Sequence, residues 1–399
     1  MAEEVCFTRV KNIGLRGVPV ADTKVSYIDG IKGELLYRGY RIEDLARQST
    51  FEEVIHLLLF GALPDRAALQ AVDQTLRSSR DLPEPVLRAL ACHPPSALPM
   101  DVLQGAVPYL ADHDPGLSKR EKDDVRAQSL RLVAQLPTVL AAWKRIREGQ
   151  PPVAPHPGLS HAANFLFMLR GEEPDAEEAH VFDVCLTLHA DHTFNASTFA
   201  AREVASTHAH LYASVAAAVG ALSGELHGGA NAQVMQMLLE IGEPDRVEAY
   251  VKARLDAGQV VMGMGHAVYK TEDPRAPILQ ELSRRLVERT GQGRWIELSE
   301  RVRDVAQAEI RRRKGQELYP NVDFYSASTY YQLGVAPDLF TPIFALGRVA
   351  GWCAHVIEEK FAEAQEKPAL YRPEAEYVGD YCGPLGCPWV PLSERKPGS

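Results

Sequence analysis

Signals that begin and end helices recur along most of this chain, and they constrain its fold more than any other feature. Thr50 with Glu53, and Asp175 with Glu178, have the spacing of a capping box, in which two side chains satisfy the first free amides of a helix. Apolar residues then repeat at helical spacing, and Gly61 ends the first of these segments. No run of strands alternates with these helices to build a parallel sheet. The sequence therefore predicts a mainly α fold.

Two further segments carry helix signals. Asp245 with Glu248 predicts a helix that ends before Gly258. Residues 211–222 have unusually small side chains and predict a helix that another backbone can approach closely. Burial in the core and a helix-on-helix contact between subunits both explain such a helix.

The remaining segments are predicted to be non-helical. Residues 24–39 alternate polar and apolar side chains around Asp29-Gly30, which is typical of a β-hairpin. The proline-rich stretches 80–100 and 148–159 are expected to be loops or element boundaries.

Length and charge limit the class of protein. The chain has 399 residues, of which 46% are hydrophobic and 24% charged, so it is long enough for two well-packed domains. Its net charge of −10 argues against a nucleic-acid partner, because phosphate binding needs a basic face. No apolar stretch has the length of about 18 residues that a membrane helix needs, so no membrane partner is expected.

The cysteines and the N-terminus predict a reduced, cytoplasmic protein. The first residues show neither the basic nor the apolar part of a secretory signal. The cysteines are scattered, as small core residues would be, and the pair near the C-terminus makes a poor zinc site because it lacks a second pair. The six are Cys6, Cys92, Cys185, Cys353, Cys382 and Cys387.

Two histidines stand in glycine-rich breaks between helices, and they are the best candidates for chemistry. His227 lies in Gly-Glu-Leu-His-Gly-Gly, and His266 follows Gly-Met-Gly. A histidine on an apolar helix face is usually a core residue, whereas one in a glycine-rich loop is placed where backbone can approach a ligand. Asp323 lies among apolar and aromatic neighbours, which suits either a structural ion pair or a general base.

Other interpretations of these motifs are weaker. Gly263-x-Gly265 resembles part of a dinucleotide-binding loop, but Val268 replaces the third small residue, and prolines interrupt the helix that must follow. His189 and His192 could ligate a metal with His227, although no recognised ligand spacing supports this. Gly-x-Ser-x-Gly and Walker-type loops are absent.

Three arginines complete the candidate site. Arg275, Arg348 and Arg372 each have an ordinary explanation as surface or helix-end charges. Together with imidazoles and one carboxylate they would suit a small polyanion, because guanidinium grips carboxylate through two hydrogen bonds.

These motifs, in this order, resemble the citrate synthase family from about residue 14 to residue 380. The segments that carry the resemblance are 27–30 with 37–40, 160–165, 188–192 with 195–197, 226–231, 263–266 with 273–275, 321–326 and 348–352. The resemblance implies a homodimer of mostly helical subunits. In each subunit a large domain (1–230 and 329–399) and a small domain (231–328) would close over the active site.

The resemblance also implies a role for each candidate residue. Asp323 would remove a proton from the methyl group of acetyl-CoA, His227 would hydrogen-bond the thioester oxygen, and His266 would polarise and then protonate the ketone of oxaloacetate. Coenzyme A is a co-substrate here, with no permanently bound cofactor and no metal. The implied oxaloacetate ligands are His192, Arg275, Arg348 and, from the other subunit, Arg372. The implied coenzyme A loop consists of Val260, Val261, Met262, Gly263, Met264 and Gly265.

Three rival functions remain open at this point. A 2-methylcitrate synthase, using propionyl-CoA, would have the same fold and site, and Lys270-Thr271 leans towards citrate. A non-catalytic binding or regulatory protein could share the fold, and a metal-dependent hydrolase is a third possibility. Some positions also depart from the family pattern, namely Glu225, Ala232, Ala267 and the tail from Cys382 to Trp389. We hypothesise that Glu225, if it points inward, raises the pKa of His227.

Overall fold

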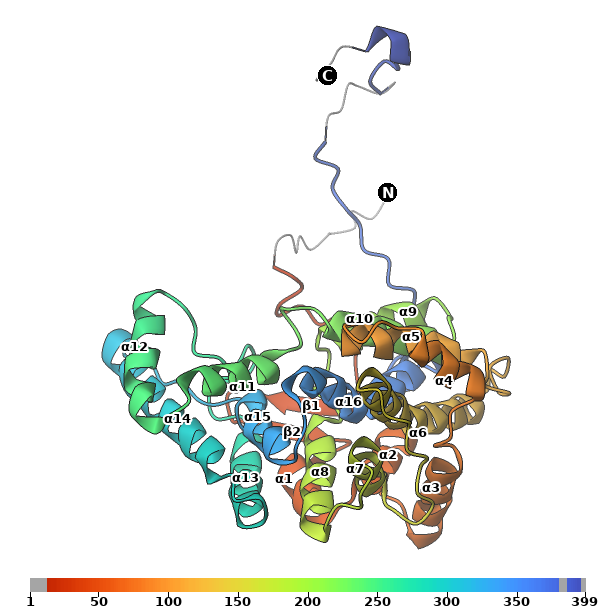
Figure 1. Cartoon of the computed structure of the whole chain (residues 1–399). Coiled ribbons are helices and arrows are strands. Elements are labelled where there is room, and N and C mark those ends of the chain that lie inside the picture. Colours follow the sequence, from red (N-terminus) through yellow and green to blue (C-terminus); the bar gives the residue numbers. More distant parts are fainter. Residues whose placement is uncertain (1–12, 380–385, 396–399) are drawn as a thin grey trace.

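A computed structural model describes residues 13–379 and 386–395. Within these ranges the chain is mainly helical, as predicted, with sixteen α-helices and one small sheet (Figure 1). The helices are α1 (Ile42–Gln48), α2 (Phe51–Phe60), α3 (Arg66–Ser78), α4 (Glu84–Ala91), α5 (Pro99–Ala111), α6 (Lys122–Arg147), α7 (His161–Arg170), α8 (Ala176–His189), α9 (Ala196–Ser206), α10 (Leu211–Leu222), α11 (Ala230–Ile241), α12 (Val247–Asp256), α13 (Ala276–Thr290), α14 (Gly293–Lys314), α15 (Val322–Gln332) and α16 (Phe340–Lys360).

The predicted hairpin is confirmed. Strands β1 (Ser26–Asp29) and β2 (Glu34–Tyr37) pair antiparallel, and the short β3 (Tyr40–Arg41) extends the sheet. The turn between β1 and β2 packs against the segment that follows His266. A Cβ on Gly30 would lie 2.4 Å from the Val268 carbonyl oxygen, so only glycine fits there.

Both predicted capping boxes form. Thr50 with Glu53 caps α2, and Asp175 with Glu178 caps α8. The helix predicted from Asp245 and Glu248 also forms, as α12, and ends at Asp256 before Gly258. Its start was wrong, because Pro244–Arg246 forms a 3₁₀ turn and α12 begins only after it, without a side-chain cap. Proline is compatible with the first turn of a helix, and here it places Asp245 inside the turn instead of at its cap.

The proline-rich stretches contain loops and element boundaries, as predicted. Residues 148–159 contain no helix or strand after the end of α6, whereas α4 lies inside the 80–100 stretch. Its prolines stand at the N-cap and in the first turn, where their missing N–H groups are not needed. Helix α10 spans the predicted residues 211–222; it packs on α5 and α9, and its remaining face of small residues is half-buried.

Helix α16 runs through the core. With the turn before it, it is long and apolar enough to span a membrane, but 89% of its most apolar window is buried inside the fold. It packs against α2, α6, α8, α9 and α10. Gly351 lets it approach the end of α8, since a Cβ there would lie 2.3 Å from the Ala190 carbonyl oxygen. The buried thiols Cys185 and Cys353 are core residues, as predicted, while Cys92 is exposed.

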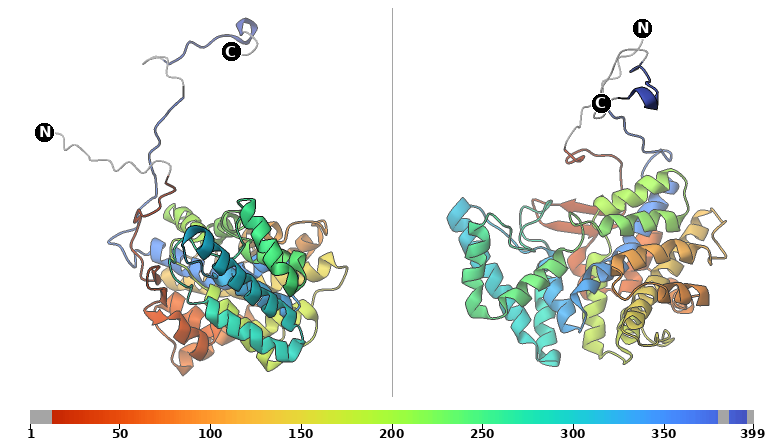
Figure 2. Two further views of the ribbon diagram at one scale, coloured as in Figure 1. Left: turned by 90° about the vertical axis from the view of Figure 1, so that its left-hand side faces the viewer. Right: turned by 45° about the horizontal axis from the view of Figure 1, so that its top comes forward.

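The helices form two groups in space. Helices α11 to α14 lie together at the left of Figure 1, and the helices from α1 to α10 surround α16 on the other side. The predicted boundaries at 230/231 and 328/329 stay predictions, as does the cytoplasmic location. The segment after Tyr371 and the first described residues leave the body on the same face (Figure 2).

Candidate active site

Seven of the predicted site residues line one cavity of about 400 Å³. They come from five separate parts of the chain, which the fold brings together between the two groups of helices. The seven are His192, His227, Gly265, His266, Arg275, Asp323 and Arg348.

His227 is held in a tight turn between α10 and α11 that requires glycine. A Cβ on Gly228 would lie 2.0 Å from the Leu222 carbonyl oxygen, and Gly229 has φ +84°. This turn aims the imidazole at the start of α9, where the backbone N–H of Ser197 donates to Nε2 over 3.1 Å. The Ser197 hydroxyl lies 2.8 Å from the same nitrogen and also accepts a hydrogen bond from the Trp352 indole.

This contact assigns the tautomer of His227. Because a backbone N–H can only donate, Nε2 must be unprotonated, and in the neutral ring the proton sits on Nδ1. Burial, reinforced by the Arg348 charge, lowers the pKa of His227 to about 4. His227 is therefore a neutral hydrogen-bond donor through Nδ1 near pH 7.

His266 has the opposite tautomer. Its Nδ1 accepts the backbone N–H groups of Val268 (2.9 Å) and Tyr269 (3.2 Å), so its proton sits on Nε2. Burial and the Arg275 charge lower its pKa to about 4. The preceding Gly265 has φ +88°, which turns the chain into this position.

Asp323 is fixed to the His266 loop by hydrogen bonds through Asn321. The Asn321 side chain accepts the Asp323 N–H over 3.0 Å and donates to the Gly265 carbonyl over 2.9 Å. The Asn321 backbone N–H donates to the Gly263 carbonyl. The carboxyl group lies in the first turn of α15, and its burial raises the pKa of Asp323 to about 6. A base of this pKa is largely ionised at neutral pH and still able to take up a proton.

The two arginines give the cavity its positive charge. Asp273 holds Arg275 through two hydrogen bonds, Nε to Oδ1 (2.9 Å) and Nη2 to Oδ2 (2.7 Å). Arg348 donates Nε to the His189 carbonyl, and its guanidinium lies 4.5 Å from the centre of the Phe344 ring. Among the described residues Arg348 forms no ion pair, and burial lowers its pKa to about 10. A buried cation without a partner favours an anionic ligand.

His192 forms one wall of the cavity. Its Nε2 lies 3.2 Å from the Tyr269 hydroxyl, and its ring centre lies 5.4 Å from that of His266. Burial, with the Arg275 charge, holds the pKa of His192 well below its usual value.

Two groups of predicted residues lie mostly outside this cavity. Of the predicted coenzyme A loop, Val260 is exposed, Val261 is buried and only Gly265 lines the cavity. Arg372 is exposed and does not line the cavity of its own chain. The roles of both stay predictions.

The two weaker interpretations of these motifs do not fit the structure. No helix begins between Gly265 and Ala276, so the dinucleotide-loop reading of Gly263-x-Gly265 fails. His189 does not line the cavity, since it is fully buried with Nδ1 on the Cys185 carbonyl. In the part of the chain described, no cluster of three or more His, Cys, Asp or Glu could hold a metal ion.

The hypothesis about Glu225 was also wrong. Glu225 is exposed. Burial and the Arg348 charge lower the pKa of His227, and Glu225 does not contribute to this shift.

Three residues that hold the site in place were not predicted from the sequence. Ser197, Asp273 and Asn321 orient His227, Arg275 and Asp323. Asn321 is the N-cap of α15, so a search for capping residues beside Asp323 would have found it. Asp273 lies two residues before Arg275, whereas Ser197 is thirty residues from His227 and has no local signal that links it to that ring. Phe344, which supports Arg348, carried no signal of its own in the sequence.

Comparison with known proteins agrees with this site. Residues 14–374 match the family model for the citrate synthase C-terminal domain. A citrate synthase from Synechocystis sp. is 46% identical and covers 96% of this chain and 93% of its own. A 2-methylcitrate synthase from Mycobacterium tuberculosis is 41% identical, over 92% of this chain and 90% of its own.

A solved structure extends the likeness to three dimensions. It is the ternary complex of carboxymethyl coenzyme A and oxaloacetate with citrate synthase from Thermoplasma acidophilum, with 32% identity and a TM-score of 0.86. The match covers 95% of this chain and 98% of that one. This chain therefore belongs to the citrate synthase family and is an enzyme of that type.

Proposed function

We propose that this enzyme condenses acetyl-CoA with oxaloacetate and water to give citrate and coenzyme A. One observation carries the proposal. A single cavity contains a carboxylate with a raised pKa, two neutral imidazoles with assigned and opposite tautomers, and two buried guanidinium groups. This set suits a reaction that forms an enol beside a bound dianion.

In this proposal the arginines bind oxaloacetate. Arg348 has no ion pair among the described residues, and both arginines can present free N–H groups to a carboxylate. His192 is a further ligand, and Arg372 reaches the site from the second subunit of a homodimer. The substrate supplies the negative charge that the cavity lacks, which explains why arginines gather here in a chain of net charge −10.

The first chemical step is enolisation. Asp323 removes a proton from the methyl carbon of acetyl-CoA, and the C–H electron pair forms the enol double bond. The thioester oxygen then becomes an oxyanion, which the Nδ1–H of His227 stabilises. A weakly acidic α-proton needs both groups at once, because the enolate is too unstable to form without a donor already in position.

Condensation and hydrolysis follow. The enol carbon attacks the ketone carbon of oxaloacetate and a C–C bond forms, while the Nε2–H of His266 gives its proton to the new alkoxide. Water then attacks the thioester carbon and gives a proton back to Nε2 of His266, and the C–S bond breaks. Coenzyme A leaves as the thiol with the proton that Asp323 took from the methyl group, and the new carboxylic acid ionises to give citrate. The proposed small domain (231–328) closes over the large one, excludes water during enolisation, and brings the loop Val260–Gly265 to coenzyme A.

The main alternative acyl donor is propionyl-CoA, since one relative is a 2-methylcitrate synthase. Propionyl-CoA has one methylene more than acetyl-CoA, and a pocket distinguishes one methylene by only about 1–3 kcal/mol. The preference between the two donors therefore depends on the shape of the acyl pocket. The test measures thiol release from acetyl-CoA and from propionyl-CoA with oxaloacetate, for the wild type and for Asp323→Ala. We expect acetyl-CoA to give the higher kcat/KM and the variant to lose activity. Near-normal turnover by Asp323→Ala would refute the mechanism, and a higher kcat/KM for propionyl-CoA would favour the alternative.

A further inference from the structure

A second set of charged side chains is buried behind the cavity wall that carries His192. We call Asp191, Arg202, His355, Glu358 and Glu359 the charge network. Each is at most 3% exposed, and together they join the end of α8, the middle of α9 and the last turns of α16. None of them lines the cavity.

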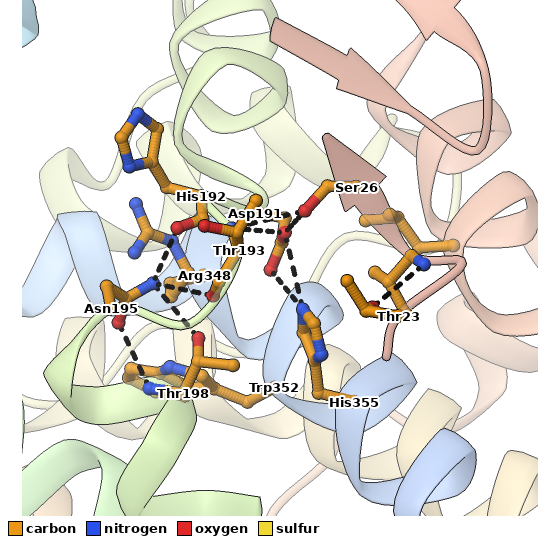
Figure 3. A network of polar contacts seen from close by, with 12 residues as sticks. Thr23, Ser26, Asp191, His192, Thr193, Asn195, Thr198, Arg348, Trp352 and His355 are labelled. Atoms are coloured by element: carbon orange, nitrogen blue, oxygen red, sulfur yellow. Dashed lines mark hydrogen bonds and ion pairs between the residues drawn. The ribbon is translucent and has the colours of Figure 1, made fainter. Parts of the chain in front are cut away.

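One end of the charge network shapes the loop that presents His192. Thr193 has φ +49°, which is unfavourable for a β-branched residue and needs support from its surroundings. The support comes from Asp191, whose Oδ2 accepts the Thr193 N–H over 2.9 Å and the Ser26 hydroxyl (Figure 3). Asn195 donates to the Thr193 carbonyl over 3.3 Å. The Asp191 carboxylate therefore stabilises the turn from which His192 enters the cavity.

The middle of the charge network is continuous. His355 places Nε2 at 3.3 Å from Asp191 Oδ1, and its Nδ1 lies 3.2 Å from Arg202 Nη1. A guanidinium can only donate, so Nδ1 accepts and Nε2–H is left to donate to Asp191. Arg202 also pairs with Glu358 (2.6 Å) and with Glu359 (2.7 Å).

The other end of the charge network anchors the C-terminal tail. The Tyr371 hydroxyl donates to Glu359 Oε2 over 2.8 Å, its backbone N–H donates to the Ser206 hydroxyl, and its ring packs on Phe199. The next residue is Arg372. Residues 372–379 are all exposed, and the C-terminal tail extends away from the body (Figure 1). The anchor of Tyr371 therefore fixes the place from which Arg372 departs.

We propose that the charge network and Tyr371 are positioning residues for the 2-oxo acid, and that they fix His192 and Arg372 through one set of buried ion pairs. This inference rests on the proposed function, because it takes both residues as oxaloacetate ligands. A purely structural role is the rival explanation. The two explanations differ in one expectation. If the charge network positions the ligands, then removing the hydrogen bond of Tyr371 weakens oxaloacetate binding through Arg372, whereas a purely structural role predicts no such effect.

The experiment measures oxaloacetate binding to the full-length protein by isothermal titration calorimetry, together with the thermal midpoint of each variant. Tyr371→Phe deletes one hydroxyl and keeps the ring contact and the backbone hydrogen bond. The matched control is Tyr212→Phe, which deletes a buried hydroxyl that donates to Asp114 over 2.6 Å and does not line the cavity. Both variants should lower the midpoint, but only Tyr371→Phe should weaken oxaloacetate binding, by about tenfold.

A double variant separates positioning from general damage. If Tyr371 acts through Arg372, then Tyr371→Phe combined with Arg372→Gln should bind oxaloacetate no more weakly than Arg372→Gln alone. Wild-type affinity in Tyr371→Phe, or additive losses in the double variant, would overturn the inference. Failure of the wild type itself to bind oxaloacetate would instead refute the proposed function, so the two outcomes can be told apart.

Discussion

The cavity and the charge network treat charge in opposite ways, although Arg348 in the cavity is as deeply buried as the residues of the charge network. In the charge network, Arg202 contacts two carboxylates, and they raise its pKa although burial opposes this. In the cavity, Arg348 and Asp323 form no ion pair with any described residue, and burial lowers the pKa of the first and raises that of the second. A folded protein rarely leaves buried charges unpaired. The unpaired charges of Arg348 and Asp323 therefore indicate where a ligand binds.

The strongest way to break this comparison is to remove the cavity carboxylate. Asp323→Asn keeps the shape of the side chain but abolishes the base, so kcat should fall by about 10²–10⁴-fold in the thiol-release assay. The folded-state pKa of about 6 lies above the ordinary value of 3.8, so the ionised group destabilises the fold at pH 7, by on the order of 1–3 kcal/mol. The inactive variant should thus unfold at a higher temperature than the wild type. An active variant, or a less stable one, would contradict this view of the cavity.

Substituting the two arginines tests the comparison directly. Arg202→Met leaves Glu358 and Glu359 buried without their cation, so the free energy of unfolding should fall by about 3–5 kcal/mol. Arg348→Met removes a cation that has no carboxylate partner among the described residues, so its cost should stay below about 1 kcal/mol, while the KM for oxaloacetate rises strongly. Urea denaturation with the same slope for both variants measures the difference. Equal losses would mean that pairing does not distinguish the two regions.

The sequence could predict which residues meet in the cavity, but not the tautomers of the histidines or which arginine forms ion pairs. His227 and His266 stood out because glycine-rich loops have a recognisable local pattern, and capping boxes predicted α2 and α8 for the same reason. The tautomers depend on which N–H group lies opposite each ring, and Ser197 is thirty residues from His227. Likewise, Arg348 and Arg202 carry the same charge in apolar surroundings, and only the packing of α16 decides which of them meets carboxylates. Such long-range pairing leaves no local pattern.

The two imidazoles should have smaller effects than the base, because each supplies one hydrogen bond to a developing charge. His227→Ala and His266→Ala should each lower kcat by about 10²–10³-fold. Ser197→Ala keeps the backbone N–H that assigns the tautomer of His227, so it should cost no more than about tenfold. Single-turnover measurements of enolisation, followed as exchange of the acetyl methyl protons, should show a defect in His227→Ala. A larger loss in Ser197→Ala than in His227→Ala would show that the hydroxyl, not the helix amide, orients the ring.

The pH dependence of kcat/KM tests the unpaired carboxylate of the cavity, because it reports the ionisation of Asp323. The base must be ionised to work, so log kcat/KM should rise with a slope of one at low pH and level off above the Asp323 pKa of about 6. The pKa values of His227 and His266, at about 4, lie too low to control this limb, because both rings are already neutral there. Glu225 is exposed and does not shift the pKa of His227, so Glu225→Gln should reproduce the wild-type profile within about twofold at every pH. If Glu225→Gln shifted the acid limb of the kcat/KM profile, then the charge of an exposed carboxylate would influence the cavity. The unpaired charges of the cavity would then not be isolated from the charges on the protein surface.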